Sequence, residues 1–308
     1  MKKNASSVAC KQKRTRAEVK RDITGLAFAA PYIVNLVVFT LIPMVSAVYY
    51  SFTKFNGIGT PEWIGLGNFR KMFFEDPQLL TSLKISFRYA IISVPVRLIA
   101  ALVIAVIMSY PSKMTNFYRV IYYIPSLIGG GVACITSWKL LWAPDGPINA
   151  LLENMGMQPV HWLTNGKIVL FNIILLEVWQ FGGQMVINLA ALKNVPKDLL
   201  EAAKVDGATS VGRFFKITLP LITPTIFLNL ITGVMGALQT FGAALLITNG
   251  GPLNRTLVYG LYQYRQAYVY RNMGYACAMA LFLGVIIVSI TMLIFKSSST
   301  WVYYRDED

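Results

Sequence analysis

Six long apolar runs limit the folds that this chain can adopt. They fall at about residues 23–50, 86–109, 119–142, 168–192, 220–247 and 273–295. A nearly uncharged stretch of about 18 residues or more can cross a membrane as a helix. In lipid, backbone polar groups must be bonded within the protein, and these runs lack the alternating pattern of β-barrel strands. We therefore predict an all-α integral membrane protein with six transmembrane helices.

The composition agrees with this prediction. Only 14% of the 308 residues are charged and the mean hydropathy is +0.53, whereas about 25% of the residues in soluble domains are charged. The chain has too few charged residues to cover the surface of a soluble globule. Its length suits one integral domain.

Basic residues are concentrated where cytoplasmic segments are expected. The net charge is +14, and eight Lys and Arg residues precede residue 22. A basic cluster beside a first span is an orientation signal and a contact for anionic membrane lipid, so we expect no nucleic-acid partner. With the N-terminus inside, the inside segments carry more than twice as many basic residues as the outside ones. The sequence predicts a basic cytoplasmic tail at 1–22, a transmembrane domain at 23–296 and a cytoplasmic tail at 297–308.

Side chains that could perform chemistry are sparse and scattered. The three cysteines are far apart and the only histidine, His161, lies in a loop, so no metal site or disulfide framework is indicated. A membrane-embedded enzyme would need a cluster of acid–base or metal-binding residues at one membrane face, and the sequence shows none. A self-sufficient carrier is a further alternative, which an inverted internal repeat would favour; we find no such repeat.

The polar segment 193–219 separates the fourth and fifth apolar runs, which a simple turn could have joined. Asn194 can cap a first helix, with Pro196 near its first helical position, where a missing N–H costs little. This helix runs through "KDLLEAAKV" and is expected to stop at Asp206 and Gly207, because glycine readily takes a left-handed C-terminal conformation.

A second helix, "VGRFFKITL", is expected after the turn. Thr209 or Ser210 can cap it, and Pro220 and Pro224 are expected to end it. Apolar side chains lie on both helices of the segment: Leu199, Leu200, Ala203, Phe214, Phe215 and Ile217. Such a helical pair could dock in a groove of a partner or lie on the membrane surface. The physical pattern alone leaves both alternatives open.

The stretch "EAAKVDGATSVGRFFKITLPLITP" resembles the EAA loop of ABC-importer permeases in its maltose-type, sugar-permease form. The matching residues are Glu201, Ala202, Ala203, Asp206, Gly207, Ala208, Phe214, Pro220 and Pro224. The stretches "TNGGPLNRT" (248–256), "YGLYQYRQAYVYRNMGYACAMA" (259–280) and "LWAPDGPINALL" (141–152) also resemble this family. The resemblance covers nearly the whole chain from about residue 25.

This resemblance implies a type I ABC-importer permease fold with a cytoplasmic EAA coupling helix. It implies a binding-protein-dependent importer in the cell membrane, with a second homologous permease subunit, two ATP-binding subunits and an external solute-binding protein. The chain has no G-x-x-x-x-G-K-[ST] phosphate loop, so ATP and Mg²⁺ are expected to bind the partner ATPases and no cofactor is expected here. The residues expected to couple the chain to an ATPase are Glu201, Ala202, Ala203, Asp206, Gly207, Ala208, Phe214 and Phe215.

The resemblance also implies a carbohydrate cargo, most readily an oligosaccharide, with polyol, glycerol-phosphate or peptide as alternatives. Sugars bind through polar hydrogen bonds and stacking on aromatic rings. The expected pathway residues in the fourth run are Glu177, Trp179, Gln180 and Gln184, and those in the fifth are Gly233, Ala237, Gln239 and Thr240. Ordinary helix packing is the alternative interpretation for each of them, and Gly233 and Ala237 lack polar side chains for a sugar.

Arg97 lies near the middle of the second apolar run, where an unpaired charge is costly. Glu177 is also placed inside a run. The two can form a structural ion pair, which we favour, or Arg97 can line the pathway for an acidic sugar.

Overall fold

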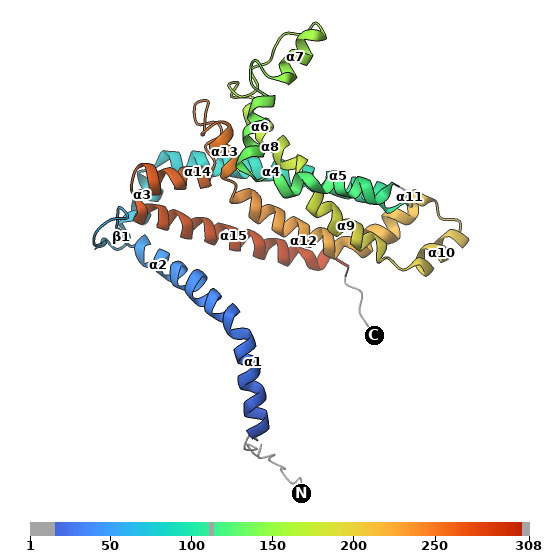
Figure 1. Cartoon of the computed structure of the whole chain (residues 1–308), viewed down its shortest axis with the longest axis horizontal. Helices are drawn as coiled ribbons and strands as arrows, with labels where there is room; N and C mark the ends of the chain where they lie inside the picture. Colours follow the sequence, from blue (N-terminus) through green and yellow to red (C-terminus); the bar gives the residue numbers. More distant parts are fainter. Residues whose placement is uncertain (1–15, 111–113, 304–308) are drawn as a thin grey trace.

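The computed structural model describes residues 16–110 and 114–303, and most of these are helical (Figure 1). The strands among them are β1 (Thr53–Lys54) and β2 (Glu62–Trp63), an antiparallel pair in which Thr53 lies opposite Trp63. The helices before residue 194 are α1 (Arg16–Asn35), α2 (Ile42–Ser51), α3 (Gly67–Phe74), α4 (Pro77–Ser109), α5 (Thr115–Ile128), α6 (Val132–Leu141), α7 (Pro147–Asn154), α8 (Val169–Trp179) and α9 (Gly182–Lys193). The later ones are α10 (Lys197–Val205), α11 (Ser210–Arg213), α12 (Leu219–Leu238), α13 (Gly242–Ile247), α14 (Tyr259–Tyr264) and α15 (Met273–Trp301).

The π-helical segments among the described residues are η1 (Leu36–Leu41), η2 (Phe214–Thr218) and η3 (Arg265–Val269). Segments η1 and η2 join the helices on either side of them, whereas η3 extends α14 and ends before α15. Within residues 16–110 and 114–303, four apolar helical stretches are long enough to cross a membrane, at Thr24–Ser51, Pro77–Ser109, Ser210–Ile247 and Met273–Trp301. In the third of these stretches, a short break at residues 239–241 separates α12 from α13. Two further bent pairs, α5–α6 and α8–α9, raise the number of candidate spans to six. The prediction of a helical protein with up to six spans is confirmed.

The third and fourth apolar runs are each broken, which corrects the expectation of single helices there. Helices α5 and α6 meet at 101° around Gly129–Gly131, three consecutive glycines that favour a break because each is costly to hold in a helix. Helices α8 and α9 meet at 44° around Gln180. At the start of α9, a Cβ on Gly182 would collide with the Tyr122 carbonyl of α5. The glycine therefore allows α9 and α5 to approach closely.

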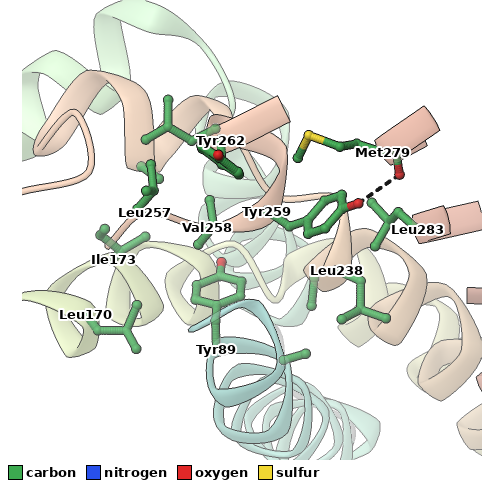
Figure 2. Packing of buried hydrophobic residues seen from close by; sticks show 14 of the residues in the cluster. Tyr89, Leu170, Ile173, Leu238, Leu257, Val258, Tyr259, Tyr262, Met279 and Leu283 are labelled. Carbon is green, nitrogen blue, oxygen red and sulfur yellow. Dashed lines mark hydrogen bonds between the residues drawn. The ribbon is translucent and has the colours of Figure 1, made fainter. Parts of the chain in front are cut away.

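Helix α4 forms the centre of the bundle, where it packs against α8, α9, α12 and α14. Its Tyr89 and the Tyr259 side chain of α14 are both completely buried (Figure 2). Tyr259 connects three helices, because its backbone N–H donates to Ser86 Oγ and its hydroxyl donates to the Met279 carbonyl. The last span is thereby attached to α14 and α4.

Asp76 attaches the same three helices to one another at the start of α4. Its Oδ1 accepts from the backbone N–H groups of Gln78 and Leu79, at 3.0 and 3.2 Å, and so caps α4. Its Oδ2 accepts hydrogen bonds from the hydroxyls of Tyr262 and Tyr275, at 2.7 and 2.6 Å. Burial and the neighbouring carboxylate raise the pKa of Tyr262. The phenol thus remains a donor to Asp76 at physiological pH.

The first span runs away from the rest of the bundle along most of its length (Figure 1). Helix α2 packs against α15, but none of the most apolar window of Thr24–Ser51 is buried within this chain. Helix α1 begins at Arg16, so part of the predicted 1–22 tail is helical, and the rest of that tail lies outside the described residues. Likewise, α15 extends to Trp301, into the predicted 297–308 tail.

The orientation predicted from the basic residues can be tested with single cysteines. Helices α10 and α11 lie at one end of the bundle, and α3 and β1 at the other (Figure 1). Lys204, Ser297 and Asn154 are all exposed, so burial cannot mask a substituted cysteine. In a chain whose native cysteines are replaced by serine, Lys204→Cys and Ser297→Cys should react with an impermeant maleimide only after the cells are permeabilised. Asn154→Cys should react in intact cells. Labelling of Lys204→Cys in intact cells contradicts the orientation.

Candidate functional site

The turn between α10 and α11 is closed by a regular set of hydrogen bonds. Gly207 has a φ of +78°, in the left-handed region that favours glycine. Its N–H donates to the Lys204 carbonyl at 3.1 Å, and the N–H of Ala208 donates to the Ala203 carbonyl at 2.9 Å. These two bonds form a Schellman motif, which satisfies the free carbonyls at the end of α10. The predicted stop at Gly207 is confirmed.

The predicted start of the second helix is confirmed, because Thr209 caps α11 by accepting from the N–H of Gly212 at 3.1 Å. The predicted cap of the first helix was wrong. Asn194 ends α9, and Pro196 takes the N-cap position of α10 without a side-chain bond. Pro196 has a ψ of 127° and is the last residue outside the helix. Val195 precedes a proline and is therefore disfavoured in the helical conformation, so the helix does not start earlier.

The prediction that Pro220 and Pro224 end the second helix was also wrong. Helix α11 continues through η2 into α12, so that Ser210–Ile247 forms one apolar helical stretch. A proline ring normally collides with the carbonyl four residues earlier, and the wider π-helical turn of η2 directly precedes Pro220. Neighbouring groups also re-satisfy freed backbone atoms in membrane helices: the Thr223 hydroxyl donates to the Pro220 carbonyl at 2.6 Å.

Most predicted coupling residues lie on an accessible surface. Glu201, Ala202, Asp206 and Gly207 are exposed, whereas Ala203, Ala208 and Phe214 are half-buried. The loop also exposes large apolar side chains: Leu199 (44%), Val205 (88%), Val211 (66%) and Phe215 (60%). We call these four residues the apolar surface of the coupling loop. This apolar surface is exposed to solvent next to Glu201 and Asp206, on a segment whose turn is held by its own hydrogen bonds.

Arg97 and Glu177 form a direct ion pair between α4 and α8. A second guanidinium nitrogen of Arg97 donates to the Gln180 carbonyl, at 3.1 Å, beside the break between α8 and α9. The side chains are 23% and 29% exposed. The structure thus places the two charges as the ion-pair hypothesis expected, and Arg97 also binds the backbone where the fourth run bends.

Buried polar groups continue from this pair toward α9 and α12. Gln184 Nε2 donates to the Asn229 carbonyl at 3.3 Å, and Asn229 Nδ2 donates to Asn188 Oδ1 at 2.9 Å. The Tyr89 side chain lies beside Glu177. Its hydroxyl forms no hydrogen bond of regular geometry with any of the described residues. We call the set the buried polar cluster: Tyr89, Ser93, Arg97, Glu177, Gln184, Asn188 and Asn229. Its remaining unbonded atoms, among the residues described, are Tyr89 Oη, Ser93 Oγ, Arg97 Nε and Gln184 Oε1.

The sequence interpretation missed four members of this cluster: Tyr89, Ser93, Asn188 and Asn229. A signal for two of them was present. Polar residues recur at 82, 86, 89, 93 and 97, a spacing of three and four residues that lies along one face of a helix. Ser82, Ser86, Tyr89 and Ser93 are all at most 1% exposed, so this polar face points into the bundle.

The remaining predicted pathway residues divide between two environments. Gly233 is half-buried and lies next to Val94 and the Gln184 amide of the buried polar cluster, whereas Ala237 is 4% exposed and lies in the hydrophobic core. Thr240 lies beside Tyr89. Trp179 is 37% exposed and contacts the Trp138 ring, with 5.9 Å between centroids.

Gln239 is exposed and lies in a different place, at a cavity of about 640 Å³ between the end of α12, α14, η3 and α15. Aromatic side chains and a second glutamine, Gln263, line this cavity as well. We call it the amide–aromatic cavity: its polar and aromatic lining consists of Gln239, Phe241, Gln263, Tyr264 and Tyr268. Only Gln239 among these was expected from the sequence.

A family model described as binding-protein-dependent transport system inner membrane component matches residues 86–300. The chain belongs to this family. The permease is 46% identical to the probable ABC transporter permease protein YesP of Bacillus subtilis, over 96% of this chain and 97% of that protein. It is 30% identical to the probable starch degradation products transport system permease protein AmyD of Thermoanaerobacterium thermosulfurigenes, over 88% and 93% of the two chains.

The fold of the permease also matches a solved structure. A chain of a bacterial alginate ABC transporter, crystallised with an alginate pentasaccharide-bound periplasmic protein, superimposes with a TM-score of 0.81 at 23% identity. The match covers 93% of the permease and 97% of that chain. The expected type I permease fold is confirmed. The permease is thus an inner-membrane component of a binding-protein-dependent ABC transporter, a transport subunit rather than an enzyme.

The Arg97–Glu177 pair can be tested by a double-mutant cycle. Removing one member of a buried pair leaves an uncompensated charge, which costs about 3–5 kcal/mol when burial is complete and less at the exposures found here. Arg97→Met and Glu177→Met should each lower the yield and thermal midpoint of the assembled complex, and the double variant should recover most of both. Arg88→Met, at an exposed cation of the same helix, is the control and should behave as wild type. Additive losses in the double variant argue against the pair.

Proposed function

We propose that the permease forms half of the translocation pathway of an ATP-driven carbohydrate importer. The other half is a second homologous permease subunit, two ATP-binding subunits lie on the cytoplasmic side, and a solute-binding protein delivers the cargo from outside. Both termini and the 193–219 loop are cytoplasmic. ATP and Mg²⁺ bind the partner ATPases, since the permease has no phosphate loop.

The observation that carries this proposal is the capped coupling loop with its exposed apolar surface. Large apolar side chains that a soluble segment leaves in water mark a docking surface. The Schellman motif and the Thr209 cap fix the turn, so an ATPase can bind the loop without first ordering it. Glu201 and Asp206 are exposed on the same segment. Their negative charges can fix the position of a docked partner and add specificity for it.

Movement of the loop then changes the pathway through the helices to which it is joined. Helix α10 follows α9, and α11 is continuous with α12 through η2. Closure of the ATPase dimer brings two such loops together and rotates the attached helices as rigid bodies. The buried polar cluster lies between α4, α9 and α12, where these movements meet.

The exposed first span supports the assembly part of the proposal. Phe28, Tyr32 and Phe39 are 85%, 71% and 74% exposed in the isolated chain. Such an apolar helix requires a nonpolar environment, which membrane lipid and the second permease subunit together provide. Helix α1 stands clear of its own bundle (Figure 1), in a position suited to cover another subunit.

The carbohydrate cargo rests on the named relative that transports starch degradation products. The test is ATPase stimulation in a reconstituted importer containing both permeases, the ATPases and the binding protein. We expect stimulation when the binding protein is loaded with a trisaccharide, either neutral or containing uronic acid, and none with mannitol, glycerol-3-phosphate or a dipeptide. Stimulation by one of the last three alone identifies a different cargo and contradicts the carbohydrate assignment.

The docking role of the loop predicts a graded response at Gly207. Gly207→Val should lower recovery of the ATPase with the permease at least tenfold, because a β-branched residue is strained at positive φ. Gly207→Asn is the matched control, since asparagine tolerates the left-handed conformation, and should retain most of the ATPase. Val205→Glu, which leaves the turn intact, should also weaken recovery by placing a charge on the apolar surface of the coupling loop. Co-purification in detergent measures all three; normal recovery with Gly207→Val and Val205→Glu refutes docking at this surface.

A further inference from the structure

Three aromatic rings form a row in the wall of the amide–aromatic cavity. The Phe241 and Tyr264 ring centroids are 5.0 Å apart, and those of Tyr264 and Tyr268 are 5.1 Å apart. Phe241 and Tyr264 are half-buried, whereas Tyr268 is 65% exposed. The row therefore extends from the interior of the subunit to its surface. Neighbouring ring planes are tilted by 43° and 39°, so each ring presents its own face, and successive pyranose rings can stack on successive aromatic rings.

A π-helical segment, η3 (Arg265–Val269), accompanies two of these rings. Tyr264 and Tyr268 are four residues apart, so they lie on the same side of the helix, and η3 begins directly after Tyr264. Such segments are rare and are found frequently at functional sites. The tyrosines are thus presented by a locally irregular helix that lies against α15.

Two glutamines supply hydrogen-bonding capacity beside the row. Gln239 Nε2 donates to the Met235 carbonyl at 3.2 Å, and Gln263 Nε2 donates to the Ala276 carbonyl at 3.4 Å. An amide offers two N–H donors and a carbonyl acceptor, so these bonds use only part of its capacity. Sugar hydroxyls both donate and accept hydrogen bonds, so they can bind the N–H groups and the carbonyl of each glutamine amide.

The residues that line the cavity include no Asp, Glu, Lys or Arg. Its opposite wall is built from small and aliphatic side chains of α15, and Cys277 is among them. Gln239, which lines the cavity, is followed in the chain by Thr240, which lies beside Tyr89 of the buried polar cluster. An uncharged, aromatic and amide-lined cavity fits the neutral part of a carbohydrate better than an ion.

We infer that the amide–aromatic cavity is a carbohydrate-binding subsite of the permease. It takes pyranose units that stack on Tyr264 and Tyr268 and whose hydroxyls bind Gln239 and Gln263. This inference rests on the proposed carbohydrate cargo and adds a location to it. The subsite lies mainly on α14, η3 and α15, from which the sequence predicted no pathway residue, and it includes Gln239 at the end of α12, which the sequence did predict.

The first test measures transport in the reconstituted importer, with the radiolabelled trisaccharide, neutral or uronic, that stimulates its ATPase. Tyr268→Leu removes the stacking surface and should lower the transport rate at subsaturating cargo about tenfold, which corresponds to about 1.4 kcal/mol. Gln263→Met removes an amide at similar volume and should lower it by a similar factor. Tyr268→Phe keeps the ring and should stay within about threefold of wild type. Tyr270→Leu, 51% exposed and absent from the cavity lining, is the matched control and should be unchanged.

The second test detects occupancy without changing the rings. In a permease with Cys10→Ser and Cys134→Ser, Cys277 reports on the cavity, and its alkylation by a small uncharged reagent can be followed by mass spectrometry of its peptide. Alkylation should slow at least threefold during turnover with the trisaccharide. Unchanged alkylation during active transport, or normal transport by both Tyr268→Leu and Gln263→Met, overturns the subsite.

Two further outcomes distinguish a carbohydrate subsite from a subunit interface and from a wrong cargo. If Tyr268→Leu loses the second permease subunit on purification, the cavity is a subunit interface and the subsite is wrong. If the wild-type importer transports no trisaccharide at all, the proposed function fails before the variants are compared. Failure of the subsite alone is recognised by normal carbohydrate transport in the variants.

Discussion

A helix that carries polar side chains through a membrane must bury them against other helices, because lipid offers them no partner. Helix α4 imposes this constraint on the permease, with a line of polar residues from Ser82 to Arg97 that points into the bundle. Each part of the line meets a different helix: Ser86 binds the start of α14, and Arg97 binds α8. The arrangement of the surrounding helices follows from satisfying these groups.

The ends of the bundle are held by different means. At the start of α4, Asp76 accepts four hydrogen bonds, two from the backbone of its own helix and two from the tyrosines of α14 and α15. At the opposite end, the coupling loop is held by its own backbone bonds, and it leaves its apolar side chains free. One end joined by bonds between helices and a self-contained loop at the other end suit the proposed transmission of movement through the subunit.

Features set by local chemistry could be predicted from the sequence. The turn at Gly207 and the Thr209 cap depend on neighbouring residues alone, and the Arg97–Glu177 pair follows from the cost of isolated charges in a membrane. The merging of α11 with α12 could not be predicted, because prolines are tolerated in a membrane helix when a π-helical turn and a threonine hydroxyl accommodate them. The amide–aromatic cavity was missed because its wall combines residues from Gln239 to Ile287, which no local pattern brings together. The breaks in the third and fourth runs also had a signal in the sequence: three consecutive glycines mark the first, and Gly182 and Gly183 directly follow the second.

Because α11, η2 and α12 are continuous, a small rotation at the coupling loop produces a larger displacement at the far end of α12. From Ser210 to Leu238 the helical path is about 40 Å long at 1.5 Å per residue, with one end in the loop and the other next to Gln239 and Thr240. A rod of that length converts a tilt of about three degrees at its base into a displacement of about 2 Å at its tip. A small angular change imposed by a docked partner is therefore large enough to open or close contacts the size of a hydrogen bond. The η2 turn, near the base of this rod, is the point at which such a lever would bend first, and its stiffness sets how much of the rotation reaches the far end.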